Sequence, residues 1–155
     1  MKINEVVDTN NLIENFSVFR KYPSSLEIII NKTNFLAKIK KDDKDFILGS
    51  NGRLITTSHD KLNLPFIFGN FEIENFFNLK KAIDETKLDY NDIKNFYSFK
   101  SGRWDIETKN GLIIKLPKDN FKRTLELYLI FISENEEKKN NTIDLRQSNQ
   151  IIING

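Results

Sequence analysis

The three residue types of a hydrolase catalytic triad are adjacent at Ser58-His59-Asp60. Of the groups in this sequence, this one has the residue types best suited to nucleophilic chemistry. A working triad brings nucleophile, base and orienting acid together from separate parts of the chain. Three adjacent side chains point in different directions, so these residues do not form that relay among themselves. His59 is the only histidine and Cys is absent, which excludes sites built from several histidines or from thiolates. The sequence therefore favours a surface turn here, and no cofactor is expected.

A second group interleaves aromatic and basic residues over residues 99–104, as proteins that bind single-stranded nucleic acid do. The chain has 24 basic and 22 acidic residues, so its net charge of +2 forms no field of one sign. Trp104 is also needed on the core face of a predicted hairpin. Neither nucleic acid nor a small-molecule substrate is therefore an expected partner.

The hydrophobic pattern of the N-terminal part predicts a short helix and then a pair of strands. Asp8-Thr9 ahead of residues 12–14 is typical of a helix cap, because a side-chain oxygen there accepts a free backbone N–H. Residues 16–21 and 26–30 flank a segment containing Pro23. We therefore predict two strands joined by a proline turn.

The next segment is predicted to be a hairpin. The mixed-charge run over residues 38–45 is expected to be a solvated turn, since charged side chains seldom lie in a core. Apolar residues 46–48 and 54–55 flank Ser50-Asn51-Gly52. That triplet is a turn signal, because glycine tolerates the positive φ that the turn requires.

The turn of a further hairpin, over residues 103–116, can be derived from its side chains. A two-residue loop at Asn110-Gly111 would place Ile106 opposite Lys115 and mix apolar and charged residues on both faces. A three-residue loop with a bulge, with Gly111 in the left-handed region, gives one uniform core face instead. The pairs that this register predicts are Thr108 with Leu112, Ile106 with Ile114 and Trp104 with Leu116.

Apolar residues spaced three and four apart predict two helices. The first covers about residues 74–85. The second begins at a cap formed by Asp119 or Asn120 and ends near Ile132, and it is apolar almost all round. We therefore expect it to be covered on more than one side, and the polar segment 134–141 after it to be a mobile loop. The apolar stripe predicted for the first helix consists of Ile73, Phe76, Phe77 and Ile83.

Two short strands are predicted at the C-terminal end, over residues 143–146 and 150–153. Residues 151–153 are three isoleucines, so this strand is apolar on both faces and has no following strand to cover it. An unprotected edge of that kind invites a strand from another protein. Strands in hairpins with two helices between them predict an α+β protein.

Read in order, these segments resemble the FtsQ/DivIB family of bacterial cell-division proteins, and its alphaproteobacterial branch in particular. The resemblance covers roughly residues 17–153 and depends on the shared order and spacing of short motifs. Residues 19–28 resemble the strand, proline turn and strand that end a POTRA domain. The other motifs are Asn51-Gly52, Leu64-Pro65-Phe66-Ile67-Phe68-Gly69, Arg103-Trp104-Asp105-Ile106, Asn110-Gly111, Lys115-Leu116-Pro117 and Ile143-Asp144-Leu145-Arg146.

The resemblance implies a truncated POTRA unit over residues 1–34 and an FtsQ-type β domain over residues 35–155, in which hairpins form a mixed sheet with helices packed on it. It implies a non-catalytic scaffold at the division septum, held by a single-pass anchor in the inner membrane with this region on the periplasmic side. The anchor is expected to lie outside this chain, since its longest apolar stretches fall far short of the ~20 residues that cross a bilayer.

The resemblance also implies that FtsB adds a strand to the C-terminal edge, with FtsL completing the FtsQ–FtsB–FtsL complex. Ile152→Pro is then expected to remove a ladder donor and abolish partner binding without unfolding the domain. Two alternatives stay open: a POTRA-type assembly or chaperone module of the periplasm, and a small periplasmic hydrolase. The residues implied to bind FtsB are Arg146, Gln147, Ser148, Gln150, Ile151, Ile152 and Ile153.

Overall fold

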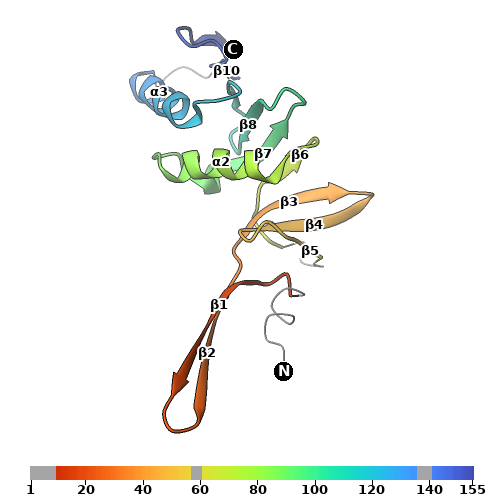
Figure 1. The fold of residues 1–155 in the computed structure, drawn as a ribbon. Coiled ribbons are helices and arrows are strands. Elements are labelled where there is room, and N and C mark those ends of the chain that lie inside the picture. Colours follow the sequence, from red (N-terminus) through yellow and green to blue (C-terminus); the bar gives the residue numbers. More distant parts are fainter. Residues whose placement is uncertain (1–9, 57–60, 136–140) are drawn as a thin grey trace. The chain divides into compact units, whose positions relative to one another are not determined.

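The structure is a computed structural model that describes residues 10–56, 61–135 and 141–155. The internal contacts of the chain divide into two compact units, residues 1–64 and 65–155, and each is described by itself (Figure 1). The Asp8-Thr9 cap and the Ser58-His59-Asp60 group lie outside the described residues, as does most of the segment expected to be a mobile loop. The predicted division into residues 1–34 and 35–155 stays a prediction.

The first unit contains a two-stranded hairpin and a three-stranded antiparallel sheet. In the hairpin, β1 (Ile13–Lys21) pairs with β2 (Ser25–Lys32). The sheet has the order β3 (Phe35–Lys41), β4 (Lys44–Gly49) and β5 (Leu54–Thr56). Both strand pairs predicted for this part of the chain are therefore confirmed, including the turn at residues 50–52, where Gly52 has a φ of +77°.

The helix predicted to open at Asp8-Thr9 is wrong for residues 12–14. The side-chain Oδ1 of Asn10 accepts the N–H of Leu12 at 3.0 Å, and the carbonyl of Asn10 accepts the N–H of Ile13 at 3.2 Å. From Ile13 onward the chain pairs with β2. An asparagine side chain that binds the backbone two residues on forms a local turn, which competes with a helix.

The solvated turn predicted over residues 38–45 is wrong in its extent. Only Asp42 and Asp43 form the turn, with φ values of +50° and +60°. Lys41 lies opposite Lys44, so the charged residues on either side belong to β3 and β4. Two consecutive left-handed residues make a tight hairpin turn, and aspartate tolerates that conformation better than most residues.

The second unit is a mixed sheet with two helices, which confirms the α+β class. Its strand order is β11-β10-β9-β8-β7-β6, with β6–β7 and β9–β10 parallel and the other pairs antiparallel. The strands are β6 (Phe66–Phe68), β7 (Ile93–Ser98), β8 (Trp104–Thr108), β9 (Ile113–Lys115), β10 (Thr142–Asp144) and β11 (Ile152–Asn154).

Both predicted helices are confirmed as α2 (Ile73–Asp84) and α3 (Phe121–Glu134), which pack against each other. Phe76 of α2 lies on the sheet, with its ring centroid 5.4 Å from that of Phe96 and 5.9 Å from that of Trp104. Of the predicted stripe, Phe76 and Ile83 are buried and Ile73 is exposed. The buried face of α2 is completed by Leu79 and Ala82.

Two expectations for α3 need correction. Asn120 stands at the N-cap, but its side chain makes no cap hydrogen bond, because its own backbone is left-handed with a φ of +58°. The helix is also not covered on more than one side by the described residues. Leu127 is 43% exposed and Ile130 is 54% exposed, so one apolar stripe of α3 faces solvent.

The derived register of the 103–116 hairpin is confirmed. Thr108 N–H donates to Leu112 O and Leu116 N–H donates to Trp104 O, each at 2.9 Å, and Gly111 has a φ of +88°. The six residues of its core face are buried, as the uniform face required. They are Trp104, Ile106, Thr108, Leu112, Ile114 and Leu116.

The two C-terminal strands form, but with different bounds from those predicted. β10 ends at Asp144 and β11 begins at Ile152. Arg146 and Gln150, which were expected in strands, therefore lie in the loop between them. We call residues 145–151 the edge loop.

Candidate partner-binding edge

β11 is the terminal strand of the sheet in the second unit, and β10 is its neighbour there. It pairs antiparallel with β10, with Asn154 opposite Thr142, Ile153 opposite Ile143 and Ile152 opposite Asp144. The side chains of Ile152 and Ile153 are 41% and 37% exposed. The predicted apolar edge is therefore present as an exposed strand.

The hydrogen bonds between β9 and β10 decide which backbone groups of β11 are free. Leu145 N–H donates to Lys115 O at 2.9 Å, so residue 145 faces β9. Asn141, which precedes the strand, bonds to both sides: its O accepts from Ile113 N–H at 3.0 Å and its N–H donates to Asn154 O at 3.1 Å. In a strand, the N–H and C=O of one residue point to the same side, and successive residues alternate between the two sides. Odd-numbered residues of β10 thus face β9, so Thr142 and Asp144 face β11.

The same alternation fixes the direction of each residue of β11. Asn154 and Ile152 lie opposite Thr142 and Asp144, so their N–H and C=O groups point into the β10–β11 ladder. Ile153 lies opposite Ile143 in the pair that exchanges no hydrogen bonds, so its N–H and C=O point away from β10. The donor that Ile152→Pro would remove therefore points into the β10–β11 ladder, and the outward donor of β11 belongs to Ile153.

The two faces of this edge differ in character. Ile153 lies opposite Ile143, which is fully buried and continues the core row of Ile114 and Ile106. Ile152 lies opposite Asp144 on the other face, in a row with Lys115 and Asp105. A strand added to β11 would meet an apolar row on one face and a charged row on the other.

Arg146 of the edge loop is held by Asp144. Its Nε lies 2.8 Å from Oδ1 and 3.0 Å from Oδ2 of that carboxylate, and its Nη2 lies 2.5 Å from Oδ2. The backbone N–H of Arg146 also donates to Oδ1 at 3.0 Å. Hydrogen bonding from Arg146 lowers the pKa of Asp144 below its ordinary value. The same hydrogen bonds to Asp144 raise the pKa of Arg146.

Asp105 extends the charged row toward the centre of the sheet. Its Oδ1 lies 2.9 Å from Nη1 of Arg103, and it stands opposite Lys115. Burial raises the pKa of Asp105, although the charges of Arg103, Lys115 and Arg146 act to lower it. The row therefore alternates in sign as Arg103, Asp105, Lys115, Asp144 and Arg146.

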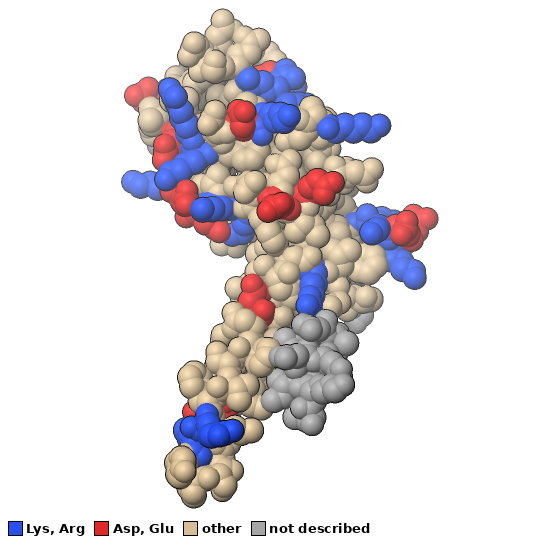
Figure 2. Space-filling model, in the orientation of Figure 1, with Lys and Arg blue, Asp and Glu red and all other residues tan. Residues whose placement is uncertain are grey.

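The charges on the molecular surface are mixed in the same way. Figure 2 shows Lys and Arg interspersed with Asp and Glu, with no continuous field of one sign on that face. Within the described residues, no group of three or more His, Asp or Glu side chains could hold a metal ion. The described helices include none that is long and apolar enough to cross a membrane.

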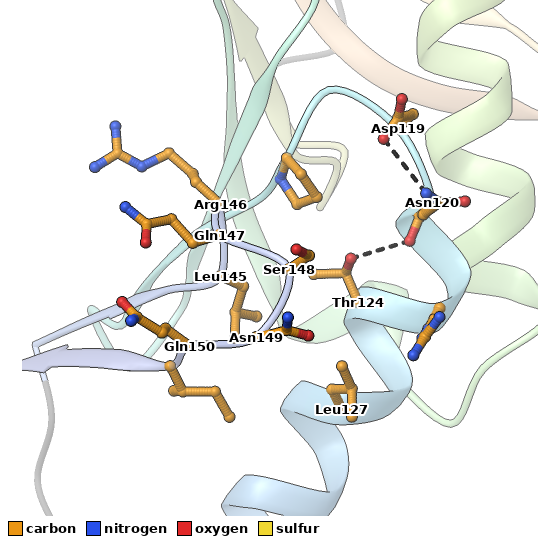
Figure 3. A pocket seen from close by; sticks show the side chains of 13 residues that line it. Asp119, Asn120, Thr124, Leu127, Leu145, Arg146, Gln147, Ser148, Asn149 and Gln150 are labelled. Atoms are coloured by element: carbon orange, nitrogen blue, oxygen red, sulfur yellow. Dashed lines mark hydrogen bonds between the residues drawn. The ribbon is translucent and has the colours of Figure 1, made fainter.

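A cavity of about 540 Å³ separates the edge loop from the first turns of α3 (Figure 3). In the close-up, Ser148 and Asn149 extend toward α3, whereas Arg146 and Gln147 extend away from it. Leu127, an exposed residue of α3, and Ile151 of the loop both contribute to the lining. The other lining residues are Pro117, Asp119, Asn120, Arg123, Thr124, Leu145 and Gln150.

The structure thus brings the seven residues implied to bind FtsB into one region, where they fall into two groups. Ile152 and Ile153 form the strand edge, and Arg146, Gln147, Ser148, Gln150 and Ile151 line the adjoining cavity. The α3 side of the cavity, with Arg123 and Leu127, was not among the predicted site residues. The sequence feature that indicates this side of the cavity is the helix that is apolar almost all round, because its apolar surface is larger than one packing partner would bury.

Comparison with known proteins identifies a family whose model matches most of this chain, up to Arg146. The family model described as "Cell division protein FtsQ/DivIB, C-terminal" matches residues 37–146. The chain is also similar to the solved structure of the major extracytoplasmic domain of the trans isomer of the cell division protein DivIB from Geobacillus stearothermophilus. That likeness has 14% identity and a TM-score of 0.48, and it covers 70% of this chain and 98% of the other.

No curated protein matches the chain. The matched family is described as one of cell-division proteins. Its model covers more than two-thirds of the chain, from β3 to the end of the Ile143-Asp144-Leu145-Arg146 motif. This chain therefore belongs to the FtsQ/DivIB family of cell-division proteins.

Proposed function

We propose that this chain binds FtsB by adding a strand of that partner to β11, and so assembles the FtsQ–FtsB–FtsL complex at the division septum. The observation that supports this function best is the outward N–H and C=O of Ile153 on an exposed terminal strand. Strand addition uses such groups for affinity and alternate side chains for specificity. In this role the chain acts as a non-catalytic scaffold, anchored in the inner membrane and facing the periplasm.

The two faces of the edge define the partner strand. The partner residue hydrogen-bonded to Ile153 directs its side chain to the same face as Ile153, beside the core row. An apolar residue is expected there, because it extends the row that ends at Ile143 and Ile153. The residues before and after it lie on the face of Asp144 and Lys115, where polar side chains are expected.

The cavity gives the partner a second place to bind. Leu127 and Ile151 are 43% and 39% exposed, and both line the cavity beside the edge loop. Burying an apolar side chain against them contributes about 25 cal/mol for each Å² removed from water. A partner segment that continues past β11 into this cavity gains affinity that the short edge alone does not supply.

The test is binding of the extracytoplasmic region of FtsB to this chain, measured by calorimetry. Ile153→Pro removes the outward N–H while the β10–β11 ladder keeps its donors, so affinity should fall about ten-fold or more with little change in Tm. Ile153→Ala keeps the N–H and loses only side-chain area, so its loss should be smaller. Unchanged affinity of Ile153→Pro would exclude strand addition at β11.

Ile152→Pro is the matched control, because it places the same residue one position away. It removes a donor from the β10–β11 ladder and should therefore loosen the strand itself. Amide hydrogen exchange separates the two directions without any partner. In the unmodified chain, Ile153 should exchange faster than Ile152 and Asn154, whose amides point into the ladder.

A further inference from the structure

We propose that Asp144 is a positioning residue for partner binding: its carboxylate holds the edge loop and so sets where β11 begins, without itself touching the partner. This inference rests on the function proposed above. It adds a residue of the neighbouring strand β10 that acts on β11 without forming the exposed edge itself. Asp144 is 9% exposed, whereas the residues it holds are on the surface.

The contacts of Asp144 fix the loop at its first turn. Oδ1 accepts from the backbone N–H of Arg146, and both carboxylate oxygens accept from the guanidinium of the same residue. The chain is therefore tied at the point where it leaves β10. A carboxylate that accepts an N–H two residues on forms an Asx turn, and a charge-assisted, two-oxygen pair with arginine adds geometric precision.

The backbone of Asp144 acts on the other end of the same loop. It faces β11, where its partner in the ladder is Ile152, the first residue of the strand. One residue thus determines both where the edge loop departs and where it returns. Between those points, the N–H of Gln150 donates to Gln147 O at 3.3 Å and makes a second turn in the loop.

The alternating charges keep Asp144 ionised and Arg146 in place. Lys115 stands beside Asp144 in β9, and beyond it Asp105 pairs with Arg103. Coulombic attraction from Lys115 and Arg146 acts on Asp144. The guanidinium of Arg146 is therefore held at the carboxylate of Asp144, and Figure 3 shows the Arg146 side chain extending away from α3.

A different arrangement would give the opposite result. If Arg146 bound an acidic partner group directly and Asp144 only neutralised it, removing the carboxylate charge would strengthen binding. If Asp144 were only structural, its loss would lower Tm and leave the affinity of the folded protein unchanged. The positioning role predicts weaker binding and a looser β11 together.

The experiment measures FtsB affinity, Tm and amide exchange for the unmodified chain and for Asp144→Asn, Arg146→Gln and the double variant. Asp144→Asn keeps an acceptor for the Arg146 N–H but loses the ion pair. Its affinity should fall about ten-fold, the size of one charge-assisted hydrogen bond. The exchange of the Ile152 amide should rise. The double variant should bind no more weakly than the weaker single variant, because both changes remove the same contact.

Asp105→Asn is the matched control, since it makes the same substitution in the same charged row, but Asp105 is hydrogen-bonded to Arg103 and acts on Arg146 of the edge loop through charge alone. Its FtsB affinity should stay within about two-fold of the unmodified chain. Unchanged or stronger binding by Asp144→Asn would overturn the inference. Failure of the unmodified chain to bind FtsB would instead overturn the proposed function, and the exchange of the Ile152 amide would still test the hold of Asp144 on β11.

Discussion

The N–H of Thr108 donates to the carbonyl oxygen of Leu112 at 2.9 Å and closes the turn in which Gly111 is left-handed. A Cβ added to Gly111 would meet nothing within 4 Å. Gly111→Ala should therefore lose about 1 kcal/mol of unfolding free energy, from its φ alone, in urea denaturation.

Gly69 gives the matched comparison, because its φ of +91° is almost the same. A Cβ there would overlap the backbone carbonyl oxygen of Ser98. Gly69→Ala should therefore lose about 3 kcal/mol or more, since strain and steric overlap add. Equal losses at the two glycines would contradict the part assigned to the overlap.

Asn51 is predicted to hold the base of the β1–β2 hairpin. Its Nδ2 donates to Asn11 O at 2.8 Å and to Ile13 O at 3.2 Å, and its Oδ1 accepts Arg53 N–H at 3.0 Å. Asn51→Ala should lose about 1–3 kcal/mol of stability and speed amide exchange in β1. Asn51→Asp keeps the acceptor and loses the donors, so it should loosen β1 while leaving the turn at Arg53 protected.

Asp105 should give stability a dependence on pH. Its pKa is raised by burial, so its protonated form favours the fold, and that contribution is lost as pH rises from its ordinary value of about 3.9 through the raised pKa. The unfolding free energy of the unmodified chain, relative to Asp105→Asn, should therefore fall over that range. Urea denaturation at a series of pH values measures it.

The contribution of Asp144 to stability should depend on pH in the opposite direction. Its pKa is lowered, chiefly by hydrogen bonding from Arg146, so its contribution is present above the ordinary value of about 3.9 and is lost as pH falls through the lowered pKa. The same series on Asp144→Asn should show that change, at a pH below the one where Asp105 acts. Curves of the same sign for both variants would contradict these assignments.

Trp104 is predicted to tolerate loss of its ring nitrogen. Its Nε1 is the one fully buried side-chain nitrogen or oxygen atom without a hydrogen-bond partner among the described residues. Phe71 and Phe76 contact its ring at centroid distances of 5.6 and 5.9 Å. Trp104→Phe should cost about 1 kcal/mol, against about 3–5 for Trp104→Ala, because it keeps most ring contacts and removes the orphan donor. Similar losses for both would contradict this account.

Much of the second unit could be predicted because its side chains allow one arrangement. The register of the Thr108–Leu112 turn followed from the requirement that Ile106 and Ile114 share a buried face, and a shift by one residue would have exposed them. The FtsQ/DivIB family followed from motifs such as Ile143-Asp144-Leu145-Arg146, and the match to residues 37–146 confirms it.

Other features depended on contacts that a sequence does not display. The helix predicted near residue 12 failed because the Asn10 side chain turns the chain there. The outward direction of Ile153 depends on the parallel β9–β10 ladder, since that ladder decides which residues of β10 face β11. The cavity beside α3 required the position of the edge loop, which no spacing rule gives.

The brevity of β11 has a consequence for solubility. Within Ile152–Asn154, a single residue directs its backbone away from the sheet, so two molecules meeting edge to edge would exchange very few hydrogen bonds. Natural proteins shorten exposed strands in this way to avoid aggregation. The isoleucines can therefore remain exposed in the unbound protein. A partner that binds this edge must supply complementary side chains as well as backbone hydrogen bonds, and those side chains make the binding selective.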